Sequence, residues 1–429
     1  MSRCNQYFSN LYDLLVCITK AVDLVSPEVP NHHWQVAYLS DHIADTLRLP
    51  VEQKRTLVIA ALLHDVGAII TSLDNFVFLE EEDPAINYHA FLGANLLSDF
   101  SLLSDAATVI RYHHIPWHNG QGNSHRGEAI PLLSHIIHLA DKIAVRVNRN
   151  ECVISQINLI KAEIISKRNS TFVPDIVDAF SEICDQEALW LDFVHKPEVP
   201  ADLSLEAIKL ALDEVVELTQ IFSRIIDFRS TFTAMHSAGV AASAVKLAEL
   251  NGMSEAECKM MRIAANLHDI GKLAVPKKIL EKQDKLEPLE YDIIRSHSFY
   301  TYRLLKPISG FEDITQWAAY HHEKLNGRGY PFHLKANSLP LGSRIMAVAD
   351  IFTAITEDRP YRKGMSKEQA IATLKGMVES GAISPSICSL LVDNYESVSC
   401  MRRESAERAV ENYHELHAPK YISACASSN

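Results

Sequence analysis

The sequence has little of what marks a secreted or membrane protein. Its eight cysteines are scattered without a CxxC pair, which favours reduced thiols over a disulfide framework or a zinc knuckle. No apolar run approaches the length needed to span a bilayer. The first residues also lack the basic lead of a signal peptide. These absences predict a soluble, cytoplasmic protein that does not associate with membranes.

Positive charge is also scarce. The 41 lysines and arginines are outnumbered by 54 aspartates and glutamates, and the formal net charge is −13. A protein that grips duplex nucleic acid needs many cations against the phosphates, so general nucleic-acid binding is not expected. A small anionic substrate needs only a few local cations, and that class of ligand stays open.

Strand signals are few, and helical patterns dominate. The 429 residues, 47% of them hydrophobic, are enough for two or three domains with proper cores. Apolar residues recur at three- and four-residue spacing over 11–25, 34–49 and 54–70. Two prolines, Pro197 and Pro200, break helical continuity. We expect an all-α protein of two tandem helical bundles. The first domain should span 1–195 and the second 203–415, followed by a tail at 416–429. A linker helix of about 204–226, capped by Ser204, should join the two bundles.

One short string carries chemistry. His268 and Asp269 stand side by side in an apolar helical run, and Lys272 follows one turn later. On a helix the three side chains share a face, and burying them is costly unless something pairs with them. A divalent transition ion meets that need, because imidazole and carboxylate are good ligands for such ions. For the dipeptide alone, a buried His–Asp hydrogen bond is the alternative.

An internal repeat favours the metal site. In each half, 32 residues separate the first two histidines of an ordered series, and 24 separate a later pair. The series in the first half is His32, His64, Asp65, His89, His113, His114 and Asp141. The series in the second half is His236, His268, Asp269, His297, His321, His322 and Asp350. Five histidines and two aspartates suit a pair of divalent ions, which activate water and neutralise charge on a phosphate oxygen.

Longer strings in the second half carry a family resemblance over about 230–400. They are HDIGK at 268–272, HHEKLNGRGYP at 321–331, ADIF at 349–352 and DRPYR at 358–362. With them, this half resembles an HD-GYP domain, a branch of the HD metal-dependent phosphohydrolases. The resemblance implies an all-helical domain that holds two iron or manganese ions, with nickel and zinc as alternatives. It also implies hydrolysis of a cyclic dinucleotide, cyclic di-GMP or 3′3′-cyclic GMP–AMP, to a linear dinucleotide.

The same resemblance implies roles for individual residues. The second series would ligate the metals, with Asp269 also catalytic, and Lys272 would contact the scissile phosphate. Gly327 and Gly329 would let the loop adopt positive φ. Arg344 could assist at the phosphates. The other substrate contacts would come from Arg328, Tyr330, Pro331, Thr353, Arg359 and Arg362.

One departure from the family pattern bears on the substrate. Thr353 stands where the family carries an aspartate that faces a base. A carboxylate accepts from two guanine N–H groups, whereas a threonine hydroxyl cannot do so bidentately. Cyclic di-GMP and cyclic GMP–AMP therefore both stay open as substrates.

The first half resembles the HD superfamily without the GYP branch. Its series is complete, but Ala68 replaces the lysine and no GYP follows His113-His114. Two interpretations of this half stay open. It is a regulatory or dimerisation module, in which case the protein could be a homodimer, or it holds a second metal site that acts as a 5′-nucleotidase on a linear product. For the whole chain, two alternatives remain: a nucleotide-sensing module without turnover and a general HD nucleotide phosphatase.

Overall fold

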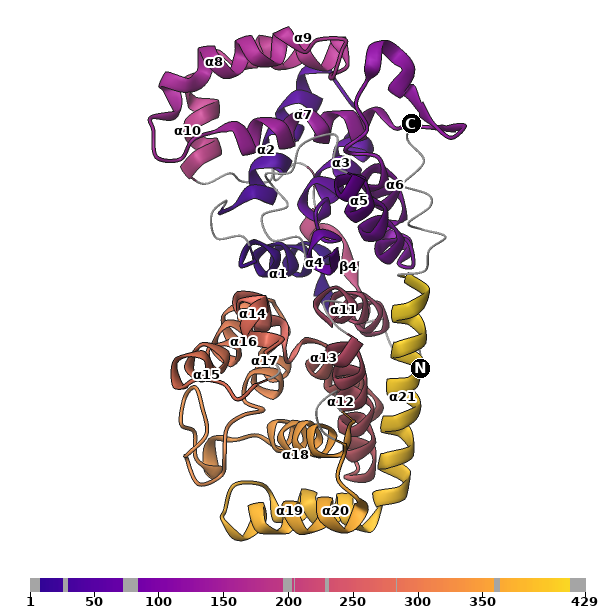
Figure 1. The fold of residues 1–429 in the computed structure, drawn as a ribbon, viewed down its shortest axis with the longest axis vertical. Coiled ribbons are helices and arrows are strands. Elements are labelled where there is room, and N and C mark those ends of the chain that lie inside the picture. The colour runs from indigo at the N-terminus through magenta and orange to yellow at the C-terminus, as the bar shows by residue number, and fades with distance from the viewer. Residues whose placement is uncertain are drawn as a thin grey trace, which may run out of the picture. The chain divides into compact units, whose positions relative to one another are not determined.

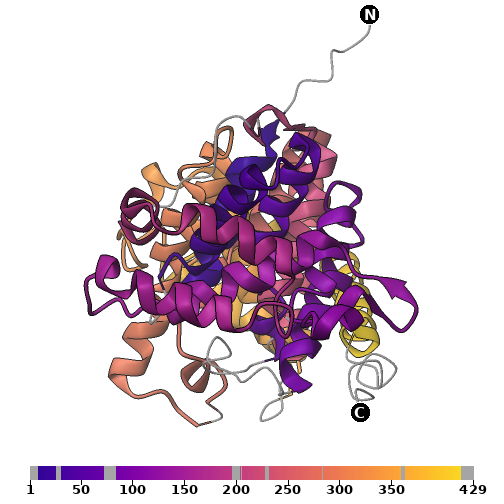
Figure 2. The ribbon, with the colours of Figure 1, turned by 90° about the horizontal axis from the view of Figure 1, so that it is seen from above.

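The computed structural model describes residues 8–25, 30–71, 84–195, 203, 205–227, 231–282, 284–358 and 363–416. Helices make up nearly all of the regular structure in these ranges (Figures 1 and 2), so the predicted all-α class is confirmed. The chain divides into two compact units. The N-terminal unit is built on Val22–Ala207, and the C-terminal unit combines the stretch ending at Ala21 with Ile208–Glu415. In the described ranges, no helix is both long and apolar enough to cross a membrane.

The N-terminal unit packs around α2, which contacts α3, α7 and α9. Its helices are α2 (His32–Thr46), α3 (Val51–Leu63), α4 (Ala68–Thr71), α5 (Pro84–Leu97), α6 (Ser104–Arg111), α7 (Leu132–Arg146), α8 (Val153–Ser166), α9 (Pro174–Ile183) and α10 (Glu187–His195). Short 3-10 turns and one strand pair complete it: η2 (Ser101–Leu103), η3 (His118–Asn123), η5 (Leu205–Ala207), β2 (Ser124–His125) and β3 (Glu128–Ala129).

The C-terminal unit packs around α12, which contacts α11, α13 and α18. Its helices are most of α1 (Leu11–Asp23), then α11 (Leu212–Asp227), α12 (Thr231–Leu250), α13 (Glu255–Leu267), α14 (Lys277–Leu280), α15 (Pro288–Arg295), α16 (His297–Leu305), α17 (Glu312–Ala319), α18 (Leu341–Thr356), α19 (Lys367–Glu379), α20 (Pro385–Asp393) and α21 (Tyr395–Leu416). The remaining elements are β1 (Ser9–Asn10), β4 (Lys209–Leu210), η6 (Ile270–Ala274) and η7 (Ala336–Ser338).

Local sequence explains where several helices begin. Ser254 and Ser366 each start a capping box with the residue three positions later, so α13 and α19 begin with their first N–H groups paired. Proline occupies the first turn of α9, α15 and α20, where its missing N–H costs nothing. Pro50 directly precedes α3.

Two predicted helices differ from the structure. The linker helix is α11, which begins at Leu212 and not at 204, because Lys209–Leu210 first pairs with Ser9–Asn10 as a strand. Ser204, the predicted cap, lies outside the described residues. This helix packs against α12 and α13 within the C-terminal unit. The predicted helix over 54–70 ends at Leu63, where the HD string turns the chain.

The division into units also differs from the predicted boundaries. Residues 1–195 were expected to form the first domain, but the stretch ending at Ala21 groups with the C-terminal unit. The strand pair of Ser9–Asn10 with Lys209–Leu210 and the backbone bond from Leu11 to Ile208 hold it there. These are pairings across about two hundred residues, which local periodicity cannot reveal.

Candidate metal centres and the HD domains

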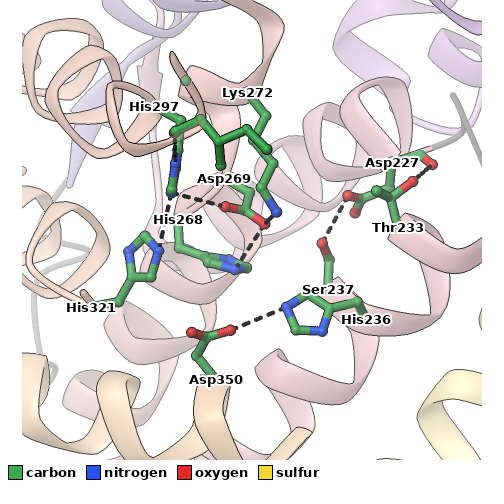
Figure 3. Close-up of polar contacts among 12 residues, drawn as sticks. Asp227, Thr233, His236, Ser237, His268, Asp269, Lys272, His297, His321 and Asp350 are labelled. Carbon is green, nitrogen blue, oxygen red and sulfur yellow. Dashed lines mark hydrogen bonds and ion pairs between the residues drawn. The ribbon is translucent and has the colours of Figure 1, made fainter. Parts of the chain in front are cut away.

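Side chains from several helices converge on one point of the C-terminal unit (Figure 3). His236 lies on α12 and Asp350 on α18, His268 caps α13, and His297 opens α16. Asp269 lies between them. One carboxylate oxygen, Oδ2, is 3.2 Å from His268 Nε2, and the other, Oδ1, is 3.5 Å from His297 Nε2.

The centre separates into two subsites on either side of Asp269. In the first, ligand atoms of His236, His268 and Asp350 lie within 4.8 Å of one another. In the second, those of His297, His321 and His322 do the same. With one oxygen facing each group, Asp269 has the position of a carboxylate that bridges two cations. Every predicted ligand of this half is therefore brought to one site.

Backbone carbonyls fix how three of these imidazoles face the centre. The Nδ1 atoms of His268, His297 and His321 lie 2.7, 2.6 and 2.6 Å from the carbonyl oxygen three residues earlier. Nδ1–H donates to that oxygen, which leaves the Nε2 lone pair directed inward, as in histidines that ligate metals. The Nε2 of His268 is buried, and its polar contact in the described part of the chain is the 3.2 Å approach of Asp269 Oδ2.

The electrostatics of the centre fit a cation. Burial lowers the pKa of His297 to about 3 and holds that of His321 well below its usual range, so both are neutral ligands near pH 7. Burial opposes charge on His236, but hydrogen bonds to Asp350 and Glu357 outweigh it and raise its pKa to about 10. Asp350 and Glu357 place two negative charges around His236. Bound cations would neutralise this negative charge. Imidazole and carboxylate together suit mid-row divalent ions.

The N-terminal unit repeats this geometry. Asp65 Oδ2 is 3.0 Å from His64 Nε2, and Oδ1 is 3.0 Å from His89 Nε2. His32 Nε2 lies 3.1 Å from Asp141 Oδ1. The two groups whose ligand atoms lie within 4.8 Å of one another are His32, His64 and Asp141, and Asp65, His89, His113 and His114. All seven predicted ligands of this half also meet at one site.

A glycine in each HD string allows the fourth ligand to approach. A Cβ added to Gly271 would lie 2.0 Å from the carbonyl oxygen of His297, and one added to Gly67 would lie 2.1 Å from that of His89. Real Cβ contacts are never this short, so only glycine permits α16 and α5 to lie against the turn. The two glycines were not among the predicted site residues, although their identical place in the two HD strings signals this role.

Comparison with known families agrees with this repeated architecture. Family profiles described as HD domain match residues 29–146 and 220–387, and each range contains one complete set of ligands. The chain is a tandem HD-domain protein. The predicted resemblance is confirmed in both halves.

Characterised relatives span nearly the whole tandem HD chain. It is 29% identical over 397 residues to 3′3′-cGAMP-specific phosphodiesterase 1 of Vibrio cholerae, covering 90% of this chain and 92% of that protein. It is 27% identical to phosphodiesterase 3 of the same specificity and organism, over 87% of this chain and 92% of that one. A crystal structure of a cyclic GMP-AMP-specific phosphodiesterase from V. cholerae matches with a TM-score of 0.63 at 25% identity, over 90% of this chain and 98% of that chain.

Lys272 distinguishes the C-terminal HD domain from the N-terminal one. Its Nζ lies 2.5 Å from Asp269 Oδ2, and its side chain is 25% exposed. The predicted continuous helix is not present, since α13 ends at Leu267 and η6 follows, but the 3-10 turn still directs the ammonium to the centre. Ala68 holds the equivalent position in the N-terminal domain and is 2% exposed.

The GYP loop is anchored by Glu323, a buried residue of the HHE string. Its carboxylate accepts hydrogen bonds from the backbone N–H groups of Phe332 at 2.7 Å and Leu334 at 2.9 Å. Gly327 has φ of 76°, as predicted, but Gly329 does not have positive φ. A Cβ on Gly329 would lie 2.4 Å from Glu323 Cα, so the requirement there is close approach.

The predicted substrate contacts fall in different places. The Tyr330 ring lies beside the centre, with its centroid 4.9 Å from that of the His322 ring and the two planes tilted by 37°, and Pro331 follows it in the loop. Arg328 is exposed. Thr353 is fully buried, and its methyl group faces Gly239. Arg359 and Arg362 lie outside the described residues.

Two contacts near the site carried no motif signal. Glu357 Oε2 lies 3.1 Å from Nδ1 of His236 and orients that ring from behind. Asp227, at the end of α11, accepts hydrogen bonds from Ser223 at 2.8 Å and Ser237 at 2.7 Å (Figure 3). Arg344, which the resemblance offered as a phosphate contact, instead donates to the carbonyl oxygens of Leu339 and Ala336.

Proposed function

We propose that the C-terminal HD domain hydrolyses 3′3′-cyclic GMP–AMP to a linear dinucleotide. The observation that carries this proposal is a complete set of seven ligands with a lysine beside the bridging carboxylate. In the reaction, the oxygen of water bonds to phosphorus, one P–O3′ bond breaks, and the 3′ oxygen takes a proton. The product keeps a 5′-phosphate.

The chain's own residues divide this work. Asp269 is at the middle of the centre, where its two oxygens can hold two ions at a fixed spacing. Bound divalent ions would supply an activated water and positive charge for the phosphate. Lys272 adds a fixed ammonium at the edge, where negative charge grows on the phosphoryl oxygens in the transition state. Tyr330 and Pro331 form the neighbouring wall that positions the substrate.

The choice of cyclic GMP–AMP over cyclic di-GMP rests on the relatives that match nearly the whole chain, which are named for cyclic GMP-AMP. Thr353, which stands where the family carries a base-binding aspartate, is fully buried against Gly239 and does not decide between the two substrates.

The N-terminal HD domain is proposed to release the 5′-phosphate of the linear product. Its seven ligands adopt the same arrangement, which a purely regulatory module would not need. It lacks the lysine and the GYP loop that would grip a cyclic diester. In this proposal, iron or manganese occupies both centres.

Paired variants test both assignments. Metal-loaded protein is incubated with cyclic GMP–AMP, cyclic di-GMP and cyclic di-AMP, and linear products and free phosphate are quantified by chromatography. His268→Ala is expected to abolish ring opening, while its positional match His64→Ala retains ring opening and loses phosphate release. Absence of linear product from every cyclic dinucleotide would contradict the enzyme and favour a nucleotide sensor. Phosphate release that survives His64→Ala would contradict the nucleotidase assignment.

A further inference from the structure

A cavity of about 400 Å³ lies in the C-terminal unit between α11, α12, α13 and α21. Its volume falls within the range of about 300–1,000 Å³ typical of small-molecule sites. None of the predicted metal ligands lines it. Ser237 and Asn266 do line it. Ser237 directly follows His236 and Asn266 lies two residues before His268, so the cavity backs onto α12 and α13, two of the helices that carry metal ligands.

Arginines give this cavity an unbalanced positive charge. Arg224, Arg262 and Arg408 all line it. Within the described ranges, Arg262 and Arg408 make no hydrogen bond or ion pair. Burial lowers the pKa of Arg262, Glu249 partly opposes this, and Arg408 lowers the pKa further. Arg262, half-buried on α13, and Arg408, exposed on α21, bring two guanidinium groups without ion-pair partners to the lining of one cavity, which indicates a place for an anion.

The described residues that line the cavity include one carboxylate, Asp227, and no ion pair joins it to Arg262 or Arg408. Its Oδ2 accepts from Ser223 and its Oδ1 from Ser237. Each carboxylate oxygen of Asp227 therefore accepts a hydrogen bond from a serine hydroxyl, one on α11 and one on α12.

We propose that this cavity binds a phosphate monoester of mononucleotide size, separately from the catalytic centre. Guanidinium groups match phosphate oxygens in bidentate geometry, and Arg262 and Arg408 would hold the phosphate. Gln220 and Asn412 offer amide groups for a sugar or base. The apolar wall of Ala238, Ala241 and Met401 would cover the rest of the nucleoside.

Calorimetry with matched arginine variants tests the site. The metal-loaded full chain is titrated with the thiophosphate analogues of AMP and GMP, which resist hydrolysis, and with inorganic phosphate. Arg262→Gln and Arg408→Gln are each expected to weaken nucleotide binding by about tenfold or more, since each removes a charge-assisted hydrogen bond. The control is Arg403→Gln. Arg403 is an exposed arginine on α21, the helix that carries Arg408, but it does not line the cavity. This variant should bind nucleotide as the wild type does.

A second variant distinguishes this site from the catalytic centre. Lys272→Met should leave cavity binding unchanged, whereas binding at the catalytic centre would weaken with it. Phenylglyoxal modification, read residue by residue by mass spectrometry, should show Arg262 and Arg408 protected by nucleotide and Arg403 unprotected. Equal affinity in all the arginine variants, or no detectable binding of any probe, would overturn the proposal. Protection by phosphate at the same concentration as by nucleotide would overturn the mononucleotide assignment.

Discussion

Replacing Lys272 with methionine should separate metal binding from catalysis. The substitution removes the ammonium and keeps a side chain of similar length. An ammonium about 4 Å from a phosphate oxygen interacts by about 4 kcal/mol at an effective dielectric constant of about 20. Loss of one such transition-state contact typically lowers kcat by about 10²- to 10³-fold. We therefore expect ring opening to slow by that factor.

Metal content provides the discriminating measurement. Lys272 now pairs with Asp269, so its removal leaves the bridging carboxylate more negative and metal binding at least as strong. The control is Lys246→Met, because Lys246 pairs with Glu249 at the same sequence spacing and its side chain is 27% exposed, close to the 25% of Lys272. Initial rates and plasma mass spectrometry on both variants check this. A kcat within threefold of the wild type, or metal lost in step with activity, would refute the reasoning.

Three further predictions concern metal, stability and packing. Asp269→Asn should remove about half of the bound metal and Asp65→Asn the other half, measured by plasma mass spectrometry; complete loss in either variant would contradict independent centres. Burial raises the pKa of Asp227 to about 6, so the stability from its proton is present below pH 3.8 and lost as the pH rises through 6. From pH 5 to 8, the free energy of unfolding of the wild type should fall by roughly 1 kcal/mol relative to that of Asp227→Asn, measured by denaturant unfolding; a difference that does not change with pH would contradict the raised pKa. Gly271→Ala should destabilise the domain by about 1–3 kcal/mol, since its Cβ would meet the His297 carbonyl oxygen; an unchanged midpoint would contradict that contact.

The sequence predicted which histidines and aspartates come together, because the repeat preserves their order and spacing. The first and last members of each series occupy matching places in the two units: α2 and α12 carry the first histidine, and α7 and α18 the last aspartate. An ordered series constrains the fold as well as the site, since the helices must converge for the ligands to meet. The all-α class followed from the same periodicity.

What the sequence could not reveal depends on contacts between distant segments. Glu357 reaches His236 across 121 positions, and no motif marks it. Thr353 looked like a base contact from its place in the family string, but packing against Gly239 buries it. The grouping of Leu11 with Ile208 likewise comes from pairing of distant backbone. The spacing of residues along the sequence shows which residues recur in both halves. It does not show which distant residues contact them in the folded protein.

The two HD domains differ in what surrounds an otherwise shared ligand set. Asp65 and Asp269 each present one oxygen to either side, so the ligands alone would not account for the different substrates that we propose for the two domains. Lys272 lies beside Asp269 in the C-terminal domain, whereas Ala68 holds that position in the N-terminal domain. The GYP loop anchored by Glu323 belongs to the C-terminal domain, and no GYP string follows His113-His114. In our proposal, selectivity between the domains arises from these two differences.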